Sequence, residues 1–371
     1  MLSDLAAPFA ESVQGTTKRS RALASDGKKI LGYFCTYTPI EIVHASGLIP
    51  VRVTGETGGV EKAYSLTPNF ICPYLRRSLE KALMGEYDFL SGLIQGYTCD
   101  AACGLTNIWK ENVGLELYHT LPLPYVDSPE SRAFFRSAIM ELVGKLEAMG
   151  GGFTDKALEE TLALYGAIRD LVLDLYDMRY RNALPLSAED LLNIVQAGFV
   201  TPPEAYLEML KTLMRRLKKR ETGKRKGLPI FLSGSLIEEP KVLGIIEASR
   251  MRVAGDDLCT GLRHFYPAGG RGKDPLDRLM DRYLHRFPCP ARARARGRVP
   301  LLIDLIRRSG ARGAVFIFQK FCTPHLSDHP VLSEELRQEG IPSILLEMEE
   351  TGMMESQMRT RLEGFYEMLE A

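Results

Sequence analysis

Seven cysteines are the residues of this 371-residue chain whose type and position point most directly to chemistry. Cys99, Cys259 and Cys322 each follow a short apolar run typical of a buried strand: YDFLSGLIQ, MRVAG and GAVFIF. Because open α/β sheets bind ligands at the carboxyl ends of their strands, these thiols are expected near a ligand site. Thiolates gathered at such an edge favour an iron–sulfur cluster, although a single free cysteine is often just a small buried hydrophobe. The other four are Cys35, Cys72, Cys103 and Cys289.

The surroundings of these cysteines carry weaker signals. Cys72 precedes a proline and Cys289 lies between two prolines, which restrain the local backbone as a metal ligand requires. Cys99 and Cys103 are four residues apart and share one side of a predicted helix. No second cysteine pair follows at zinc-finger spacing, so zinc is disfavoured and Cys103 is interpreted as a packing residue.

Carboxylates and histidines supply the candidate proton carriers. Glu41, His44 and His325 lie near cysteines in the sequence, although each also suits a purely structural role. Asp256 and Asp257 could ligate a metal or carry protons. Carboxylates are hard ligands that suit iron–sulfur clusters poorly, and such a pair commonly caps a helix.

The motifs of several other enzyme classes are absent from the sequence. It holds no GxxxxGK[ST] phosphate loop, no GxGxxG after a strand, no GxSxG elbow and no HExxH. GETGG at 55–59 predicts a turn, and the basic run 215–227 predicts a solvated helix end with a linker rather than a nucleic-acid site. RARARGR, ending at residue 298, could grip the phosphates of an acyl-CoA or form a solvated arginine helix.

Composition and charge indicate a soluble globular protein. Lysine plus arginine equals aspartate plus glutamate at 47 each, so no net field favours nucleic acid or an anionic membrane. No apolar stretch approaches the roughly 18 residues of a membrane helix, and the N-terminus lacks the pattern of a secretory signal. We therefore expect a cytoplasmic protein, in which cysteines serve metal binding or catalysis rather than disulfides.

Two stretches of alternating strands and helices are expected to position the cysteines. Strands are predicted at 49–53, 87–94, 115–124, 228–235, 251–255, 313–318 and 342–349. Helices are predicted at 38–47, 72–85, 101–112, 238–250, 327–340 and 355–371, the first capped by Thr38 and ended by Gly47. This alternation predicts mostly parallel sheets covered by helices.

Long helix-periodic segments without strand signals separate the two stretches, at 131–150, 155–181 and 202–221. We therefore predict an α/β protein with two doubly wound (Rossmann/flavodoxin-like) lobes plus a helical domain. The predicted parts are an N-terminal helical segment (1–25), the first lobe (26–128), a helical section (129–226) and the second lobe (227–371).

Four blocks of the sequence together carry a family resemblance. They are GYFCTYTPIEIVHASGLIPVRV, CPYLRRSLEKAL with YDFLSGLIQGYTCD, LSGSLIEEPKVLGIIE with GDDLCTGLRHF, and VFIFQKFCTPH with EMEETGMMESQMRTRLEGFYEML. In this order they resemble the 2-hydroxyacyl-CoA dehydratase superfamily (the D-component family of 2-hydroxyglutaryl-CoA dehydratase), which includes benzoyl-CoA reductase subunits and double-cubane cluster proteins. The resemblance runs from about Gly32 to the C-terminus and is weakest in the helical middle.

The resemblance implies a dimer of such subunits with an oxygen-sensitive cluster between the lobes. It also implies a separate ATP-hydrolysing activator protein, with its own 4Fe–4S cluster, that injects a low-potential electron. The missing phosphate loop agrees, because ATP would be hydrolysed on that partner. In dehydratase subunits three cysteines hold one 4Fe–4S cluster, and the matching positions are Cys72, Cys99 and Cys322. Three ligands leave one iron open to polarise a substrate oxygen.

The number of cysteines separates the members of this family. Double-cubane proteins hold an 8Fe–9S cluster with six cysteines of one subunit, and the resemblance implies Cys35, Cys72, Cys99, Cys259, Cys289 and Cys322. We favour such a homodimeric protein that reduces small molecules, ahead of a 4Fe–4S subunit of an acyl-CoA dehydratase or benzoyl-CoA reductase. A cluster-free scaffold is the third alternative. Thr323 stands where many relatives carry an acidic residue, which puts an acid–base role there in doubt.

Overall fold

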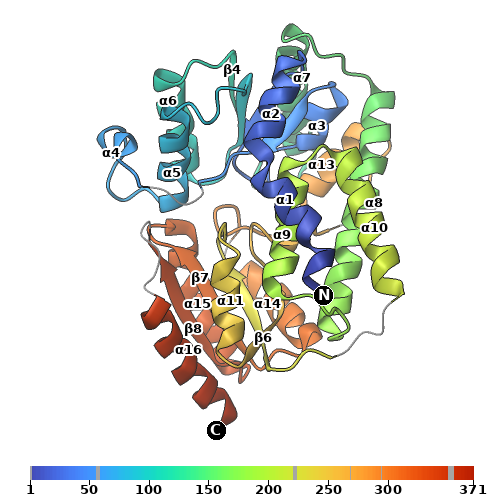
Figure 1. Cartoon of the computed structure of the whole chain (residues 1–371). Coiled ribbons are helices and arrows are strands. Elements are labelled where there is room, and N and C mark those ends of the chain that lie inside the picture. Colours follow the sequence, from blue (N-terminus) through green and yellow to red (C-terminus); the bar gives the residue numbers. More distant parts are fainter. Residues whose placement is uncertain (1, 56–58, 220–223, 268, 294, 350–354) are drawn as a thin grey trace.

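Two four-stranded parallel sheets organise the chain in the computed structural model, which describes residues 2–55, 59–219, 224–267, 269–293, 295–349 and 355–371 (Figure 1). The strand order is β2-β1-β3-β4 in the first sheet and β6-β5-β7-β8 in the second, with every pair parallel. The strands are β1 Ile30–Tyr33, β2 Ile49–Arg52, β3 Gly92–Gly96, β4 Leu117–Leu121, β5 Leu228–Gly234, β6 Met251–Asp256, β7 Gly313–Gln319 and β8 Ser343–Met348. Two doubly wound α/β lobes are confirmed.

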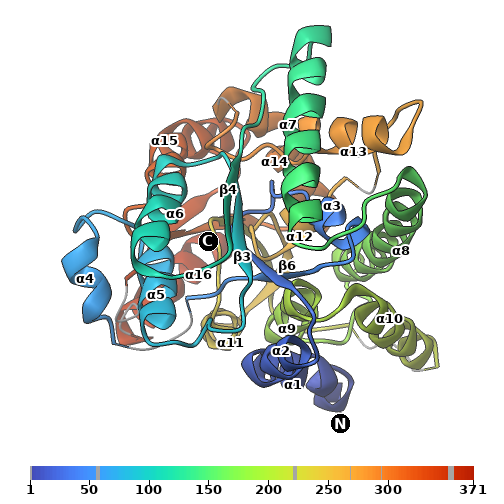
Figure 2. The ribbon, with the colours of Figure 1, turned by 90° about the horizontal axis from the view of Figure 1, so that it is seen from above.

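Helices cover both faces of the first sheet, as Figure 2 shows from above. On one face α3 (Ile40–Ala45) and α7 (Pro129–Ala148) share an apolar core with alternate strand residues. On the other face lie α5 (Pro73–Leu83) and α6 (Asp100–Asn112), with the short α4 (Lys62–Leu66) beside α5. Burial of both faces explains why the strands are almost continuously apolar.

The second sheet is covered in the same way. Helices α11 (Lys241–Ala248) and α16 (Glu355–Glu370) pack on one face, and α14 (Ala295–Ser309) and α15 (Thr323–Gln338) on the other. Two further helices, α12 Leu262–Phe265 and α13 Pro275–Leu284, lie in the connection between β6 and β7.

The remaining helices join the two lobes. The long α8 (Asp155–Tyr180) contacts α3 of the first lobe and β6 of the second, and α9 (Ala188–Val200) contacts both β2 and α11. Helix α10 (Pro203–Lys218) packs against α8. The N-terminal elements are η1 Leu2–Leu5, α1 Ala7–Gln14 and α2 Thr16–Ser25, of which α1 packs against α9. The residue limits of the four predicted parts stay a prediction.

The structure corrects several local expectations. The central strand β1 was not expected, because it has only four residues and one of them is Gly32. Helices α9 and α13 were not expected either, and β3 begins only at Gly92. Thr38 does not cap α3: Pro39 precedes that helix, and the Thr38 hydroxyl accepts a hydrogen bond from the Gly96 N–H at 3.1 Å. Gly47 does end the helix, with a φ of 79°.

Candidate functional site

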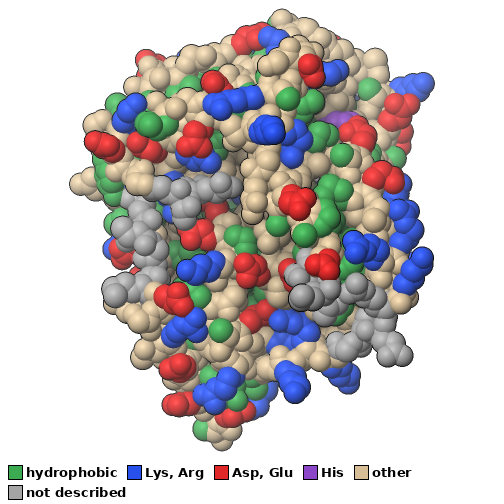
Figure 3. All heavy atoms as spheres, viewed as in Figure 1, with side chains coloured by type: hydrophobic (Ala, Val, Ile, Leu, Met, Phe, Trp, Pro, Cys, Tyr) green, Lys and Arg blue, Asp and Glu red, His purple; other side chains and the backbone are tan. Residues whose placement is uncertain are grey.

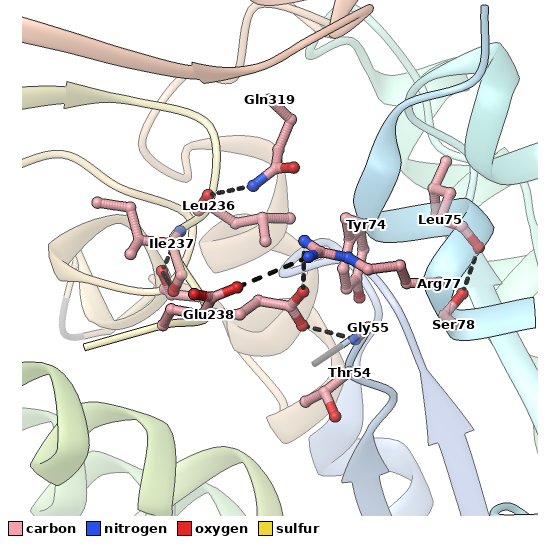
Figure 4. A network of polar contacts seen from close by, with 12 residues as sticks. Thr54, Gly55, Tyr74, Leu75, Arg77, Ser78, Leu236, Ile237, Glu238 and Gln319 are labelled. Atoms are coloured by element: carbon pink, nitrogen blue, oxygen red, sulfur yellow. Dashed lines mark hydrogen bonds and ion pairs between the residues drawn. The ribbon is translucent and has the colours of Figure 1, made fainter. Parts of the chain in front are cut away.

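The carboxyl edges of the two sheets face one junction between the lobes, and Figure 4 shows a polar network that spans it. The carboxylate of Glu238, in the loop after β5, accepts a hydrogen bond from the Gly55 N–H at 2.7 Å, just beyond β2. The Arg77 guanidinium of α5 lies 3.8 Å from the other Glu238 oxygen and 3.6 Å from Glu239. A Cβ at Gly55 would lie 2.5 Å from the Tyr74 carbonyl, so only glycine permits this approach.

Three cysteines at this junction stand at the N-terminal ends of helices. Cys72, Cys99 and Cys322 directly precede α5, α6 and α15, and we call them the helix group. Burial raises the pKa of Cys72 to about 11 and also raises the pKa of Cys99 and Cys322 well above the usual value of a thiol. Backbone N–H groups in the first turn of each helix act in the opposite direction and lower the pKa of each thiol.

Three other cysteines stand in loops at the same junction. Cys35 follows β1, Cys259 follows β6, and Cys289 lies beyond α13; we call them the loop group. Burial and then the neighbouring thiols of Cys259 and Cys35 raise the pKa of Cys289 to about 12. Cys35 and Cys259 thus both act on Cys289 at this junction.

The two groups adjoin each other. The pKa of Cys99 is raised by burial and then by Cys72, but also by Cys35 and Cys289 of the loop group. The pKa of Cys322 is raised by burial and then by Cys72 and Cys99, with a smaller contribution from Cys259. Six thiols from both lobes therefore converge on one site, and all seven cysteines of the chain are half-buried and free of disulfides. Cys103 lies one turn along α6, where burial and, to a smaller extent, Cys35 raise the pKa of its thiol.

Polar side chains point at the sulfurs of the loop group. The Arg263 guanidinium donates to the Cys259 sulfur at 3.1 Å, and the Thr98 hydroxyl donates to the Cys35 sulfur at 3.5 Å. Arg52 donates to the Cys259 carbonyl at 3.2 Å. These donors stabilise negative charge on sulfur, as a metal-bound thiolate requires.

His325 connects the loop group to the helix group. Its Nε2 lies 3.2 Å from a nitrogen of Arg263, which can only donate, so Nε2 accepts and the ring proton is on Nδ1. Nδ1 lies 3.3 Å from the Cys322 sulfur and donates to it. Burial, followed by Arg263 and Arg298, lowers the pKa of His325 well below its usual value, so the ring is neutral. Arg263 thus fixes the tautomer that His325 presents to Cys322.

The donor set fits an iron–sulfur group. Six soft sulfur donors lie at this junction, and burial raises the pKa of Cys72, Cys99, Cys289 and Cys322, so these four thiols would not ionise together without a cation. A bound metal deprotonates a coordinating thiol outright. The residues present thus suit a polynuclear iron site better than a single zinc ion, which takes four ligands.

The other predicted proton carriers lie away from the sulfurs. Glu41 is buried, pairs with Arg169 at 3.0 Å and accepts from the Tyr283 hydroxyl at 2.7 Å. The His44 ring bonds Thr161 of α8 and Glu204 of α10, both at 2.9 Å. Among the described contacts, His325 alone of the three candidates touches a cysteine sulfur.

The two adjacent aspartates have structural partners. Asp256 accepts from the Leu258 and Leu262 N–H groups and from the Tyr176 hydroxyl, so it caps the turn that leads into α12. Asp257 is fully buried and pairs with Arg263 and Arg298, each at 3.3 Å. Asp257 therefore holds the arginine that contacts Cys259.

The arginine-rich segment 292–298, of which residue 294 lies outside the described part, is not a solvated helix. Arg298 is only 2% exposed and pairs with Asp257 and Asp328. Arg292 donates to the Tyr97 and Pro124 carbonyls. The basic run at 215–218 does form the end of α10, as predicted, whereas 220–223 and residues 56–58 of GETGG lie outside the described residues.

Comparison with known proteins identifies the family. The family described as 2-hydroxyglutaryl-CoA dehydratase, D-component, matches residues 35–369. The chain belongs to this family. The phenyllactyl-CoA dehydratase beta subunit of Clostridium sporogenes is 26% identical over 92% of both chains. A benzoyl-CoA reductase subunit of Thauera aromatica is 27% identical over 93% of this chain and 92% of its own, and the lactoyl-CoA dehydratase beta subunit of Anaerotignum propionicum is 27% identical over 93% of both.

These relatives are named as subunits of dehydratases and of a reductase. As a member of the same D-component family, the chain is an enzyme subunit of the dehydratase and reductase type. None of the described helices is long and apolar enough to cross a membrane. Acidic and basic side chains are interspersed over the face shown in Figure 3, in keeping with their equal numbers.

Sequence reasoning missed Arg263, Thr98 and Arg52, the polar residues around the loop group. Arg263 follows Cys259 by four residues, a spacing that puts both on one side of a helical turn. Thr98 directly precedes Cys99, yet its hydroxyl donates to the Cys35 sulfur. No spacing in the sequence indicates this contact. Only the first of the three therefore had a usable signal.

Proposed function

We propose that this chain is an iron–sulfur reductase that holds an 8Fe–9S double cubane with six cysteines, works as a homodimer on small molecules and resides in the cytoplasm. The observation that carries the proposal is the position of two groups of three cysteines at one junction, where Arg263 contacts both the Cys259 sulfur and His325, and His325 contacts the Cys322 sulfur. Each group offers three cysteine ligands for one 4Fe–4S cube, and because the two groups adjoin each other they could hold two such cubes bridged by sulfide. A cluster-free scaffold would have no use for six buried thiols at one site.

The surrounding residues have defined tasks in this proposal. Arg263, His325 and Thr98 donate to sulfurs of both groups and stabilise their negative charge. The junction half-buries these cysteines and so limits the access of water to their sulfurs. When bound, such a cluster supplies electrons at low potential. They arrive from a separate ATP-hydrolysing activator protein with its own 4Fe–4S cluster, which the family resemblance implies.

A second candidate is a single 4Fe–4S cluster on the helix group, in a subunit of an acyl-CoA dehydratase or aryl-CoA reductase. The names of the relatives favour it, because they denote single subunits of dehydratases and a reductase that are named for CoA esters. The loop group would then be a set of thiols without iron, and a related second chain would complete a heterodimer.

Iron content separates these candidates. The protein would be purified under anaerobic conditions, and iron and acid-labile sulfide would be measured per chain, with an EPR spectrum of the reduced form. About eight irons and nine sulfides per chain support the double cubane. About four irons support the dehydratase or reductase subunit, and a colourless, iron-free protein supports the scaffold.

A further inference from the structure

A small cavity lies between helices of both lobes and the helical section. Its polar wall comes from Glu41 of α3, Arg169 of α8, His264 of α12, and Arg282 and Arg286 at α13. The cavity measures about 10 Å³, room for a single water-sized particle. Its apolar and aromatic wall is Ile40, Tyr165, Ile168, Phe265 and Tyr283.

The charges around this cavity do not balance. Arg169, Arg282 and Arg286 bring three positive charges, all at most 5% exposed, and arginine cannot be deprotonated in proteins. Glu41 is the one acidic group that lines the cavity within the described chain, and its carboxylate is shared by Arg169 and the Tyr283 hydroxyl. The wall thus carries an excess of two positive charges.

Other titratable groups around the cavity do not supply the missing negative charge. Burial, together with the neighbouring arginines, lowers the pKa of His264 well below its usual value, so its imidazole is neutral. Burial raises the pKa of Tyr165 and Tyr283, so both hydroxyls keep their protons. Burial by itself raises the pKa of Glu41, but Arg282 and Arg169 reverse this and keep it ionised.

Several buried N–H groups of the cavity wall lack a partner. Nε and Nη1 of Arg282, Nε of Arg286 and Nδ1 of His264 have no hydrogen-bond partner among the described residues. The Nη2 groups of both arginines donate to one acceptor, the His264 carbonyl, at 3.3 Å from Arg282 and 2.5 Å from Arg286. A buried charged donor without a partner is strongly unfavourable, so this arrangement calls for an acceptor.

We propose that the cavity binds one small monovalent anion, of the size of chloride, between Arg169, Arg282 and Arg286. A water molecule would satisfy donors but leave the charge excess. A carboxylate or phosphate group has several heavy atoms and exceeds the space for one particle. The anion would tie together α3, α8 and α13, of which α3 follows Cys35 and α13 precedes Cys289 in the chain.

The inference does not depend on the iron content of the protein. A negatively charged cluster at the cysteines is the competing source of the charge that balances the arginines. The two sources can be distinguished, because removing the cluster would remove its charge but would leave a bound anion in place. Anion binding persists in protein from which the iron has been stripped. The test therefore compares the anaerobically purified protein with its iron-free form.

Thermal unfolding in a chloride titration is the first measurement, with sodium methanesulfonate keeping the ionic strength constant. We expect chloride and bromide to raise the Tm of both protein forms by about 3 °C at saturation. The Arg282→Gln variant loses this response, and the matched variant Arg308→Gln, at a half-exposed arginine of α14, keeps it. A Tm that no halide shifts in wild-type protein of either form overturns the proposal.

Crystals grown in bromide provide a second measurement that needs no variant. We expect an anomalous peak for bromide between the guanidinium groups of Arg169, Arg282 and Arg286. Bromide found only at the surface, with water at this position, also overturns the proposal. A response to halide only in the iron-free form would assign the balancing charge in the iron-bound protein to the cluster and likewise count against the proposal.

Discussion

The helix group and the loop group of cysteines reach the same junction by different means. Each thiol of the helix group stands directly before a helix and is supported by the backbone N–H groups of its first turn. In the loop group, Cys35 and Cys259 receive hydrogen bonds from the side chains of Thr98 and Arg263, while Cys289 has a backbone N–H, that of Ala291. In the helix group, Cys322 has the side chain of His325 in addition to its backbone support. Backbone support needs only that a helix begins at the cysteine, whereas side-chain support depends on particular residues elsewhere in the chain.

This difference indicates which group is more easily altered by substitution. Any sequence that starts a helix after the cysteine preserves the support of the helix group. In the loop group, Cys259 loses its side-chain donor when Arg263 changes, and Cys35 loses its donor when Thr98 changes. We therefore expect the helix group to hold metal more robustly, and the loop group to decide how many irons the protein carries.

Cys99→Ser is expected to have the largest effect, because Cys99 adjoins both groups. Loss of this ligand should lower the iron content by more than about tenfold, since the helix group then lacks a ligand and the less robust loop group is not expected to hold iron without it. Iron analysis and the visible absorption of anaerobically purified protein measure this. A variant that kept half or more of its iron would show that the two groups bind metal independently.

Cys289→Ser is expected to have an intermediate effect that distinguishes the groups. If each group holds one cube, the variant should retain about half of the iron, near four per chain, on the helix group. Iron and sulfide analysis with EPR spectroscopy measures the change. Wild-type protein with about four irons, and no loss in the variant, would show that the loop group carries no metal.

Sequence reasoning predicted the positions of some cysteines better than their surroundings. A cysteine directly after an apolar run is a local pattern, so the positions of Cys99, Cys259 and Cys322 at strand ends could be predicted from neighbouring residues. The six-cysteine set itself came from the family resemblance. The side chains around the loop group come from distant segments: Thr98 meets Cys35 across 63 positions. Such pairings follow from tertiary packing.

The fold shows the same division between local and distant information. Seven of the eight strands coincide with predicted apolar runs, but β1 was missed because four residues with a glycine give little periodicity. The arginine segment ending at Arg298 was interpreted as solvated or phosphate-binding, since its charge suggests exposure. Its burial depends on Asp257 and Asp328, which no local pattern associates with it.

Arg263→Met is expected to change the electronic properties of the site more than its iron content. The substitution removes a positive charge 3.1 Å from the Cys259 sulfur and frees the His325 tautomer, so the reduction potential should fall by roughly 50–150 mV. Potentiometric titration with EPR detection measures the shift. Asp257 keeps Arg298 as a partner, which limits the damage to the fold.

Arg263→Lys is the matched control for that substitution, because it keeps the charge but not the fork of donors. We expect it to recover most of the potential of the wild-type protein. If both variants shifted the potential equally, the geometry of the donors rather than their charge would determine it. If neither shifted it, the loop group would hold no redox-active metal.

Cys103→Ser is expected to have the smallest effect and marks the boundary of the site. Cys103 lies one helical turn beyond Cys99 and is half-buried, and its pKa is raised mainly by burial. Iron content should stay within error of wild type, and the free energy of unfolding should change by about 0.5 kcal/mol or less. Iron analysis and urea unfolding measure both. Loss of iron comparable with that of Cys289→Ser would make Cys103 a ligand, and the division into two groups of three would then be wrong.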